Sequence, residues 1–212
     1  MKELIDVIVK EQRLLLTATL QHINISLLAV LIGAAVAIPA GIWLTRNKKT
    51  AGVVLGITGV AQTIPSLVLF GLALPVFGLG FRPALIVLAL YSILPVLRNT
   101  YTGISEVDGK YVEAAKGMGM SELQRLFKVE LPIALPVIIA GIRISLVYII
   151  SWTTVAALIG AGGLGDLIWT GLQTYDRNLI IVGAIPASLL ALAAGAIIGM
   201  VQKKVTPRGM RE

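Results

Sequence analysis

The sequence predicts an all-α integral membrane protein with about five transmembrane helices. Of the 212 residues, 57% are hydrophobic and only 14% are charged, whereas about a quarter of the residues of a soluble domain are charged. The mean hydropathy is +0.90. Several uncharged runs reach the length of about 20 residues that a helix needs to cross a bilayer. Lipid is therefore the expected solvent for most of the chain.

Charged, glycine-rich and proline-rich stretches separate the expected spans. The first span ends at Arg46, and Pro65 and Pro75 interrupt the second. The third continues past Arg98, whose long side chain can snorkel to the interface. We expect spans over residues 23–45, 52–75, 83–101, 135–159 and 179–202. Residues 1–22 are expected to form an extracytoplasmic amphipathic segment, and residues 203–212 a basic cytoplasmic tail.

The distribution of positive charge predicts the orientation. With the N-terminus outside, the inner segments carry 12 Lys and Arg residues and the outer segments carry 5, leaving Arg143 uncounted. Cytoplasmic loops are the positively charged ones, so the protein is expected to be N-out and C-in. The net charge of +7 is then explained by these loops, and no nucleic-acid partner is expected. Arg143 lies inside the fourth span, either as a functional charge or as a snorkelling side chain.

Composition also limits the chemistry. The chain has no cysteine and one histidine, which leaves no pattern for a disulfide or a metal site. The phosphate-binding pattern G-x-x-x-x-G-K-[ST] is absent, so we expect no cofactor on this chain and no enzymatic activity in it. Gly160-x-Gly162-x-x-Gly165 has the letters of a dinucleotide fingerprint but lacks its strand and helix context. We interpret it as a tight outer turn and a candidate outer gate comprising Gly162, Gly163 and Gly165.

The loop over residues 102–134 is long and carries helix signals. Asp108 is a suitable N-cap for a helix that ends at Gly117 and Gly119. Ser121 and Gln124 have the spacing of a capping box, which predicts a second helix over residues 122–129, stopped at Leu131-Pro132. Such an element could dock onto a partner protein or rest on lipid headgroups.

The same loop resembles the EAA motif of bacterial ABC importer permeases. The matching residues are Glu113, Ala114, Ala115, Gly119, Val129, Leu131 and Pro132, with Val129 where the family has Ile. The resemblance implies the type I permease fold over residues 23–202, in a multi-pass protein of the bacterial cell membrane. It also implies that these residues couple to a cytoplasmic ATPase, which binds ATP and Mg²⁺. The other implied partners are a second permease subunit, identical or homologous, and a separate extracytoplasmic substrate-binding protein.

Three further stretches resemble the osmoprotectant branch of these permeases, which imports glycine betaine, choline and carnitine. They are residues 62–66, 97–103 and 160–166. The resemblance implies a transporter subunit for quaternary amines. The alternatives are an ABC permease for another small solute, such as methionine or a phosphonate, and an ATP-independent secondary transporter or channel. Secondary transporters often carry repeated halves and intramembrane acidic residues, and the expected spans contain neither.

Polar and aromatic residues inside the expected spans are candidates for a translocation path. A quaternary ammonium cannot donate hydrogen bonds and is best held by aromatic faces. Intramembrane hydroxyls, however, often only bond back to their own or a neighbouring helix. The candidates are Gln62, Thr63, Pro65, Ser66, Tyr91, Tyr148, Trp152, Thr153 and Thr154.

Overall fold

The computed structural model describes residues 11–206. This part of the chain is helical and contains no strand. The helices are α2 (Gln12–Arg46), α3 (Lys48–Ala61), α4 (Ser66–Phe77), α5 (Phe81–Ser105), α6 (Gly109–Gly117), α7 (Glu122–Arg125), the π turn η1 (Leu126–Glu130), α8 (Leu131–Ala156), the 3-10 turn η2 (Ala157–Ile159), α9 (Leu164–Thr174) and α10 (Arg177–Val205).

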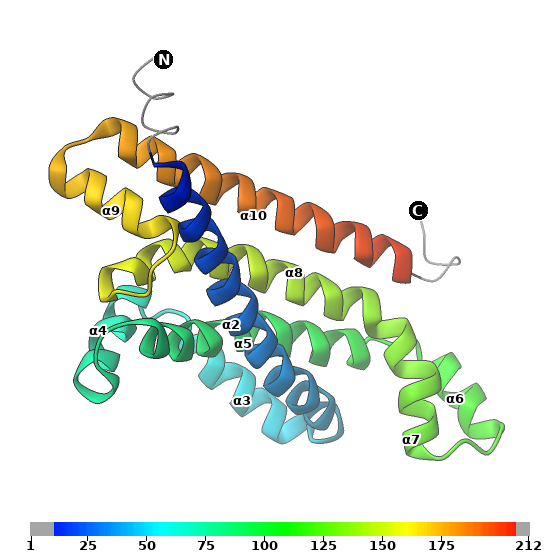
Figure 1. The fold of residues 1–212 in the computed structure, drawn as a ribbon. Helices are drawn as coiled ribbons and strands as arrows, with labels where there is room; N and C mark the ends of the chain where they lie inside the picture. The colour runs from blue at the N-terminus through cyan, green and yellow to red at the C-terminus, as the bar shows by residue number, and fades with distance from the viewer. Residues whose placement is uncertain (1–10, 207–212) are drawn as a thin grey trace.

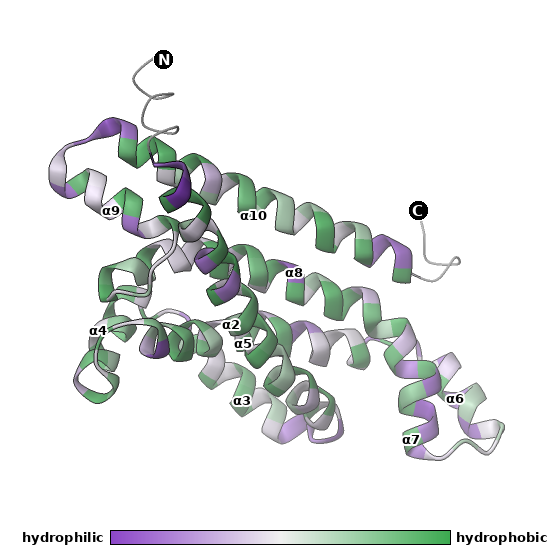
Figure 2. Ribbon diagram, in the orientation of Figure 1, coloured by the Kyte–Doolittle hydropathy of each residue, from purple (hydrophilic) through white to green (hydrophobic). Residues whose placement is uncertain are grey.

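The molecule has two polar ends and an apolar middle. The start of α2, α9 and the start of α10 lie at one end, and α6, α7 and the end of α10 lie at the other (Figure 1). Hydrophilic residues gather at these two ends, and the long helices between them are mostly hydrophobic (Figure 2). Following the charge distribution, we call the end with α9 the outer end and the end with α6 the cytoplasmic end.

Within residues 11–206, four helical stretches are long and apolar enough to cross a membrane. They contain α2, α5, α8 and α10, and the bent pair α3–α4 makes a fifth span if it is counted as one. The expectation of about five spans is thus confirmed. The helices extend beyond the expected bounds at most ends, and α2 includes residues 12–22 as its first turns. Residues 1–10 and 207–212, expected to be an amphipathic segment and part of a basic tail, lie outside the described residues.

Helices α2, α5 and α8 form the core. Small residues let them approach closely, since a Cβ added at Gly33 would lie only 1.7 Å from Ser92 Oγ. Ser92 Oγ donates to the Ala29 carbonyl at 3.0 Å, and Ser145 Oγ donates to the Ser92 carbonyl at 3.1 Å. Close packing and interhelical hydrogen bonds of this kind stabilise helix association in lipid. They fix α5 between its two neighbours.

The second expected span, over residues 52–75, is not one helix. Helices α3 and α4 meet at an angle of 91° across residues 62–65. Pro65 has no N–H to donate, and proline disfavours helical geometry in the residue before it. Pro75, by contrast, lies inside α4 without ending it.

The expected stop at Leu131-Pro132 is wrong. Helix α7, the π turn and α8 follow one another without a loop, and Leu131 N–H donates to the Leu126 carbonyl across the π turn. A π turn shifts backbone groups out of the α-helical pattern. Pro132, which lacks an N–H, is accommodated directly after it. The second helix of the loop is therefore continuous with the fourth span.

Candidate translocation site and coupling element

The loop between α5 and α8 forms the predicted helix–turn–helix. The Asp108 carboxylate accepts from Lys110 N–H at 3.0 Å and caps α6. Ser121 Oγ accepts from Gln124 N–H at 3.3 Å, and Gln124 Oε1 accepts from Ser121 N–H at 2.9 Å. Gly119 has φ +76°, a left-handed geometry that suits glycine. The N-cap, the glycine turn and the capping box are all confirmed.

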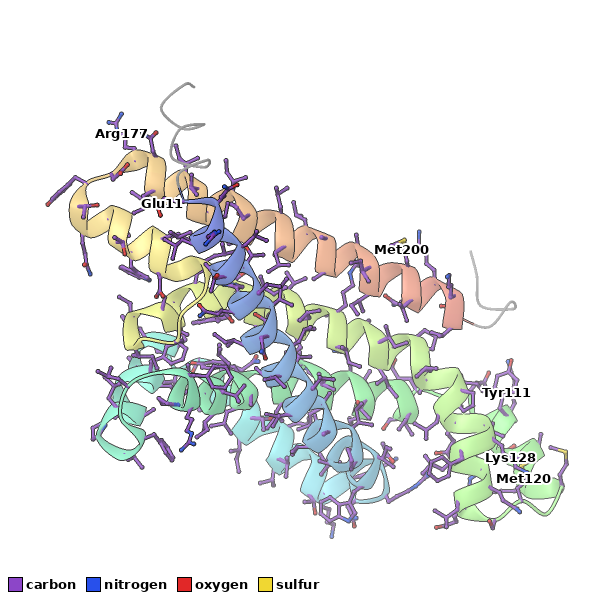
Figure 3. The ribbon with its side chains drawn as sticks, viewed as in Figure 1. Glu11, Tyr111, Met120, Lys128, Arg177 and Met200 are labelled. Carbon is purple, nitrogen blue, oxygen red and sulfur yellow. The ribbon has the colours of Figure 1, made fainter. Side chains whose placement is uncertain are left out.

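This element exposes apolar side chains at the cytoplasmic end. Tyr111 is 49% exposed, Met118 and Leu123 are each 69% exposed, and Phe127 is 63% exposed. Tyr111, Met120 and Lys128 lie together there, far from Glu11 and Arg177 at the outer end (Figure 3). Exposed apolar residues among polar ones are typical of a protein-binding surface.

The residues of the EAA-like motif fall into two groups. Glu113, Ala114 and Gly119 are exposed on α6 and its turn, whereas Ala115 is buried beneath them. Val129, Leu131 and Pro132 lie on the π turn and the start of α8. The motif therefore joins an exposed helix to the base of a membrane span.

A buried ion-pair cluster at the base of this element was not predicted. Glu130, 3% exposed, accepts from Arg46 Nη2 at 2.6 Å and from Arg125 Nε at 3.1 Å. Arg125 is also buried, and Arg46 is the last residue of α2. The cluster joins the base of the α6–α7 helix–turn–helix to α2 as well as to α8. No sequence spacing signals a pair that is 84 residues apart.

The break between α3 and α4 lies against an aromatic pair. The rings of Tyr91 and Trp152 stack with centroids 5.2 Å apart and planes 15° apart. Tyr91 Oη donates to the Ile64 carbonyl, in the segment between α3 and α4. A cavity of about 240 Å³ is lined here by Gln62, Tyr91, Tyr148, Ile149 and Trp152. Four predicted path residues from three helical spans thus meet at one cavity.

The other predicted path residues do not line this cavity. The Thr63 hydroxyl donates to the Val60 carbonyl near the end of α3, and the Thr154 hydroxyl donates to the Ser151 carbonyl of its own helix. Thr153 Oγ1 donates to the Ile149 carbonyl at 2.7 Å and lies 3.1 Å from Ser26 Oγ on α2. Pro65 and the buried Ser66 begin α4. The hydroxyls of Thr63, Thr153 and Thr154 thus bond to backbone carbonyls three or four residues earlier, as intramembrane hydroxyls often do.

The glycine-rich outer turn is fastened to α2. His22 Nε2 lies 2.9 Å from the Ile150 carbonyl, and Leu164 N–H donates to His22 Nδ1 at 3.3 Å. Since a carbonyl only accepts and an amide N–H only donates, His22 must carry its proton on Nε2. Gly163 N–H donates to Gln21 Oε1 at 3.2 Å. The turn is therefore held by side chains from the first span.

Backbone geometry explains the glycines of this turn. Gly162 and Gly163 have φ +84° and +90°, and a Cβ added at Gly165 would lie 2.3 Å from the Thr154 carbonyl oxygen. The turn ends in α9, a helix that the sequence reading missed. Over residues 11–206, no group of three His, Cys, Asp or Glu side chains could hold a metal ion.

Comparison with known proteins identifies the family. The model of the family described as "Binding-protein-dependent transport system inner membrane component" matches residues 29–210. The chain belongs to this family. It is a multi-pass permease subunit of the bacterial inner membrane.

Curated relatives match over nearly their whole length. The chain is 48% identical to the choline transport system permease protein OpuBB of Bacillus subtilis, over 93% of this chain and 91% of that protein. It is also 48% identical to the carnitine transport permease protein OpuCB of Listeria monocytogenes, with the same coverage. The B. subtilis glycine betaine/carnitine/choline permease protein OpuCB is 46% identical, over 93% of this chain and 91% of that protein.

Solved structures share the fold. A chain of the MetNI methionine ABC transporter superposes with a TM-score of 0.85 at 20% identity, covering 93% of this chain and 99% of that one. A chain of an amino acid ABC transporter gives a TM-score of 0.75 at 21% identity, covering 93% and 96%. The expected type I permease fold is thus confirmed.

Proposed function

We propose that this permease imports quaternary-amine osmoprotectants, the class of glycine betaine, choline and carnitine. The observation that carries this proposal is the 46–48% identity to three permeases named for choline, carnitine or all three solutes. A separate extracytoplasmic protein delivers the solute. A separate cytoplasmic ATPase, holding ATP and Mg²⁺, supplies the energy, and a second permease subunit completes the membrane path.

The cavity at the α3–α4 break suits such a solute. Aromatic faces attract a quaternary ammonium without needing a hydrogen bond from it, and Trp152, Tyr91 and Tyr148 present three rings there. The Gln62 amide can donate to the carboxylate of a betaine or accept from the hydroxyl of choline. We assign the cavity a transient role, because a weakly attractive site lets the solute leave toward the cytoplasm.

The position of the break supports a water-filled path. Residues 62–65 are exposed, and non-helical backbone at membrane depth is tolerated only where it is buried in protein or lines a water-filled cavity. The Ile64 carbonyl has Tyr91 Oη as a partner, and the remaining polar groups of this segment can bond to water. The path would thus pass beside Gln62.

Coupling would run through α6 and α7. The exposed apolar residues Tyr111, Met118 and Leu123 form the surface on which we place the ATPase, with Glu113 beside them. Because α7 continues through the π turn into α8, a displacement of this surface would move α8 and with it Tyr148 and Trp152. ATP-driven closure of the ATPase would thereby reshape the cavity.

Uptake by cells tests the proposal. A bacterial strain lacking osmolyte uptake would express the permease with its ATPase, partner permease and binding protein. We expect ATP-dependent uptake of at least one of radiolabelled choline, glycine betaine and carnitine, and copurification of the ATPase in mild detergent. Uptake of methionine without any quaternary amine would overturn the substrate class. Uptake that persists without an associated ATPase would overturn the coupling.

A further inference from the structure

Arg143 is a charged residue within a membrane span, and among residues 11–206 no carboxylate pairs with it. Neither α8, which carries Arg143, nor α10, which packs against it, contains Asp or Glu. A charge at membrane depth is costly unless a counter-charge or water compensates it. Among the described residues no counter-charge does so, which leaves water or a bound anion to compensate the guanidinium.

The guanidinium is placed against α10 by a glycine. A Cβ added at Gly199 would lie 3.3 Å from Arg143 Cζ and Nη1, closer than ordinary van der Waals contact. Gly199 lies six residues before Val205, the end of α10, or about 9 Å along the helix at 1.5 Å per residue. Arg143 thus lies just inside the cytoplasmic end of the span.

A cavity of about 410 Å³ opens at this point between α8 and α10. Lys203 adds a second positive charge, and Gln202 adds an amide that can donate hydrogen bonds. Gly199 and Met200 form part of its wall. Figure 3 places Met200 near the end of α10 that lies on the same side as α6 and α7. The lining combines two cations with hydrogen-bond donors, as phosphate binding requires.

An apolar strip on α10 leads to the cavity. Its members follow the helical repeat on one face and are all at least 40% exposed: Ile181, Ile185, Leu189, Leu192 and Met200. Such a strip can accept an acyl chain, and the lysine and arginine beyond it can accept a headgroup. The cytoplasmic leaflet is also the leaflet with the negative surface potential.

We propose that this cavity binds the phosphate headgroup of an anionic phospholipid of the cytoplasmic leaflet. The Arg143 guanidinium and the Lys203 ammonium bind the phosphate, and an acyl chain lies along the strip on α10. Basic pockets between transmembrane helices on the cytoplasmic side have the chemistry for this role. The lipid would neutralise Arg143 and hold the ends of α8 and α10 together.

Native mass spectrometry of the full-length permease in mild detergent tests the assignment. We expect phosphatidylglycerol to bind more tightly than phosphatidylcholine. Arg143→Gln and Lys203→Gln should each weaken phosphatidylglycerol binding about tenfold, because each removes a charge-assisted hydrogen bond to the phosphate. Arg177→Gln, at the outer end of α10, should leave phosphatidylglycerol binding unchanged. Phosphatidylglycerol should also raise the melting temperature of the parent more than that of Arg143→Gln.

A variant that keeps both charges guards against misfolding. Gly199→Leu places a side chain where the guanidinium lies, so it should weaken phosphatidylglycerol binding while the elution volume and helical content stay those of the parent. Equal binding of phosphatidylglycerol by the parent, Arg143→Gln and Gly199→Leu would overturn the proposal. Equal binding of phosphatidylcholine, or binding of inorganic phosphate without lipid, would overturn the assignment to an anionic lipid.

Discussion

Arg46 Nη2 lies 2.6 Å from Glu130 Oε2, so the end of the first span is bound to the π turn that joins α7 to α8. Glu130 is 3% exposed and its second oxygen accepts from the buried Arg125. A buried carboxylate between two guanidinium groups is strongly oriented. Movement of α7 would therefore reach α2 as well as α8. We expect α2 to take part in the transmission of force.

Glu130→Gln should impair both stability and coupling. The substitution leaves Arg125 buried without a full counter-charge, and breaking a buried pair in this way costs about 3–5 kcal/mol. We expect a lower melting temperature in detergent, and a drop in uptake larger than the drop in ATP hydrolysis by the assembled complex. Arg46→Gln should have a smaller effect because that side chain is 38% exposed. Glu106→Gln, an exposed position directly after α5, is the matched control; an equal loss there would contradict the role of the cluster.

Glu113→Lys should uncouple uptake from ATP hydrolysis. Glu113 is exposed on α6, so the substitution should leave the fold unchanged, while the reversed charge should weaken docking of the ATPase on the surface proposed above. We expect uptake to fall at least tenfold, with reduced ATPase copurification or hydrolysis that no longer responds to the binding protein. Lys116→Glu reverses a charge on the same helix, α6, and shows whether the effect is specific to position 113. Unchanged uptake in Glu113→Lys would contradict the coupling role.

Trp152→Ala should reduce uptake of quaternary amines about tenfold, because a cation–π contact contributes about 0.5–2 kcal/mol. Trp152→Phe retains an aromatic face and should recover part of the activity. Uptake kinetics in cells would measure both variants. Trp43→Ala removes a tryptophan that is 55% exposed on α2 and should have no effect. If Trp152→Ala transports as the parent does, the cavity is not on the path.

Gln62 should affect which quaternary amine is preferred. Its amide lines the cavity with the aromatic rings, and it can donate to a carboxylate as well as accept from a hydroxyl. Gln62→Glu can still accept from choline but repels the carboxylate of glycine betaine and carnitine. We expect the ratio of choline uptake to betaine uptake to rise severalfold. An unchanged ratio would show that selectivity resides elsewhere, as in the binding protein.

His22→Leu should loosen the outer turn. It removes the acceptor of the buried Leu164 N–H, which costs about 1–3 kcal/mol when left unsatisfied. The Ile150 carbonyl, inside α8, loses only its second partner. The chain has no cysteine, so a single cysteine can report on the turn. In an Ala161→Cys background, where position 161 is 6% exposed, His22→Leu should speed labelling by an impermeant maleimide. Equal labelling rates with and without His22 would contradict this role.

Local signals in the sequence were sufficient for much of this protein. Apolar runs of membrane length predicted the spans, because a helix must satisfy its own backbone in lipid. Asp108, Ser121 and Gln124 predicted the caps of α6 and α7, because capping depends on residues three or fewer positions apart. The aromatic candidates Tyr91, Tyr148 and Trp152 followed from the chemistry of the expected solute.

Only the tertiary structure decided which distant residues meet. Glu130 pairs with Arg46, His22 holds the outer turn, and Tyr91 supports the break beside Pro65. The tertiary structure also decided which path candidates line the cavity: Gln62 does, whereas Thr153 and Thr154 do not. Each of these outcomes depends on how α2, α5 and α8 pack. Residue spacing along one helix describes its faces, but the neighbour that covers each face is set by close packing among all the helices.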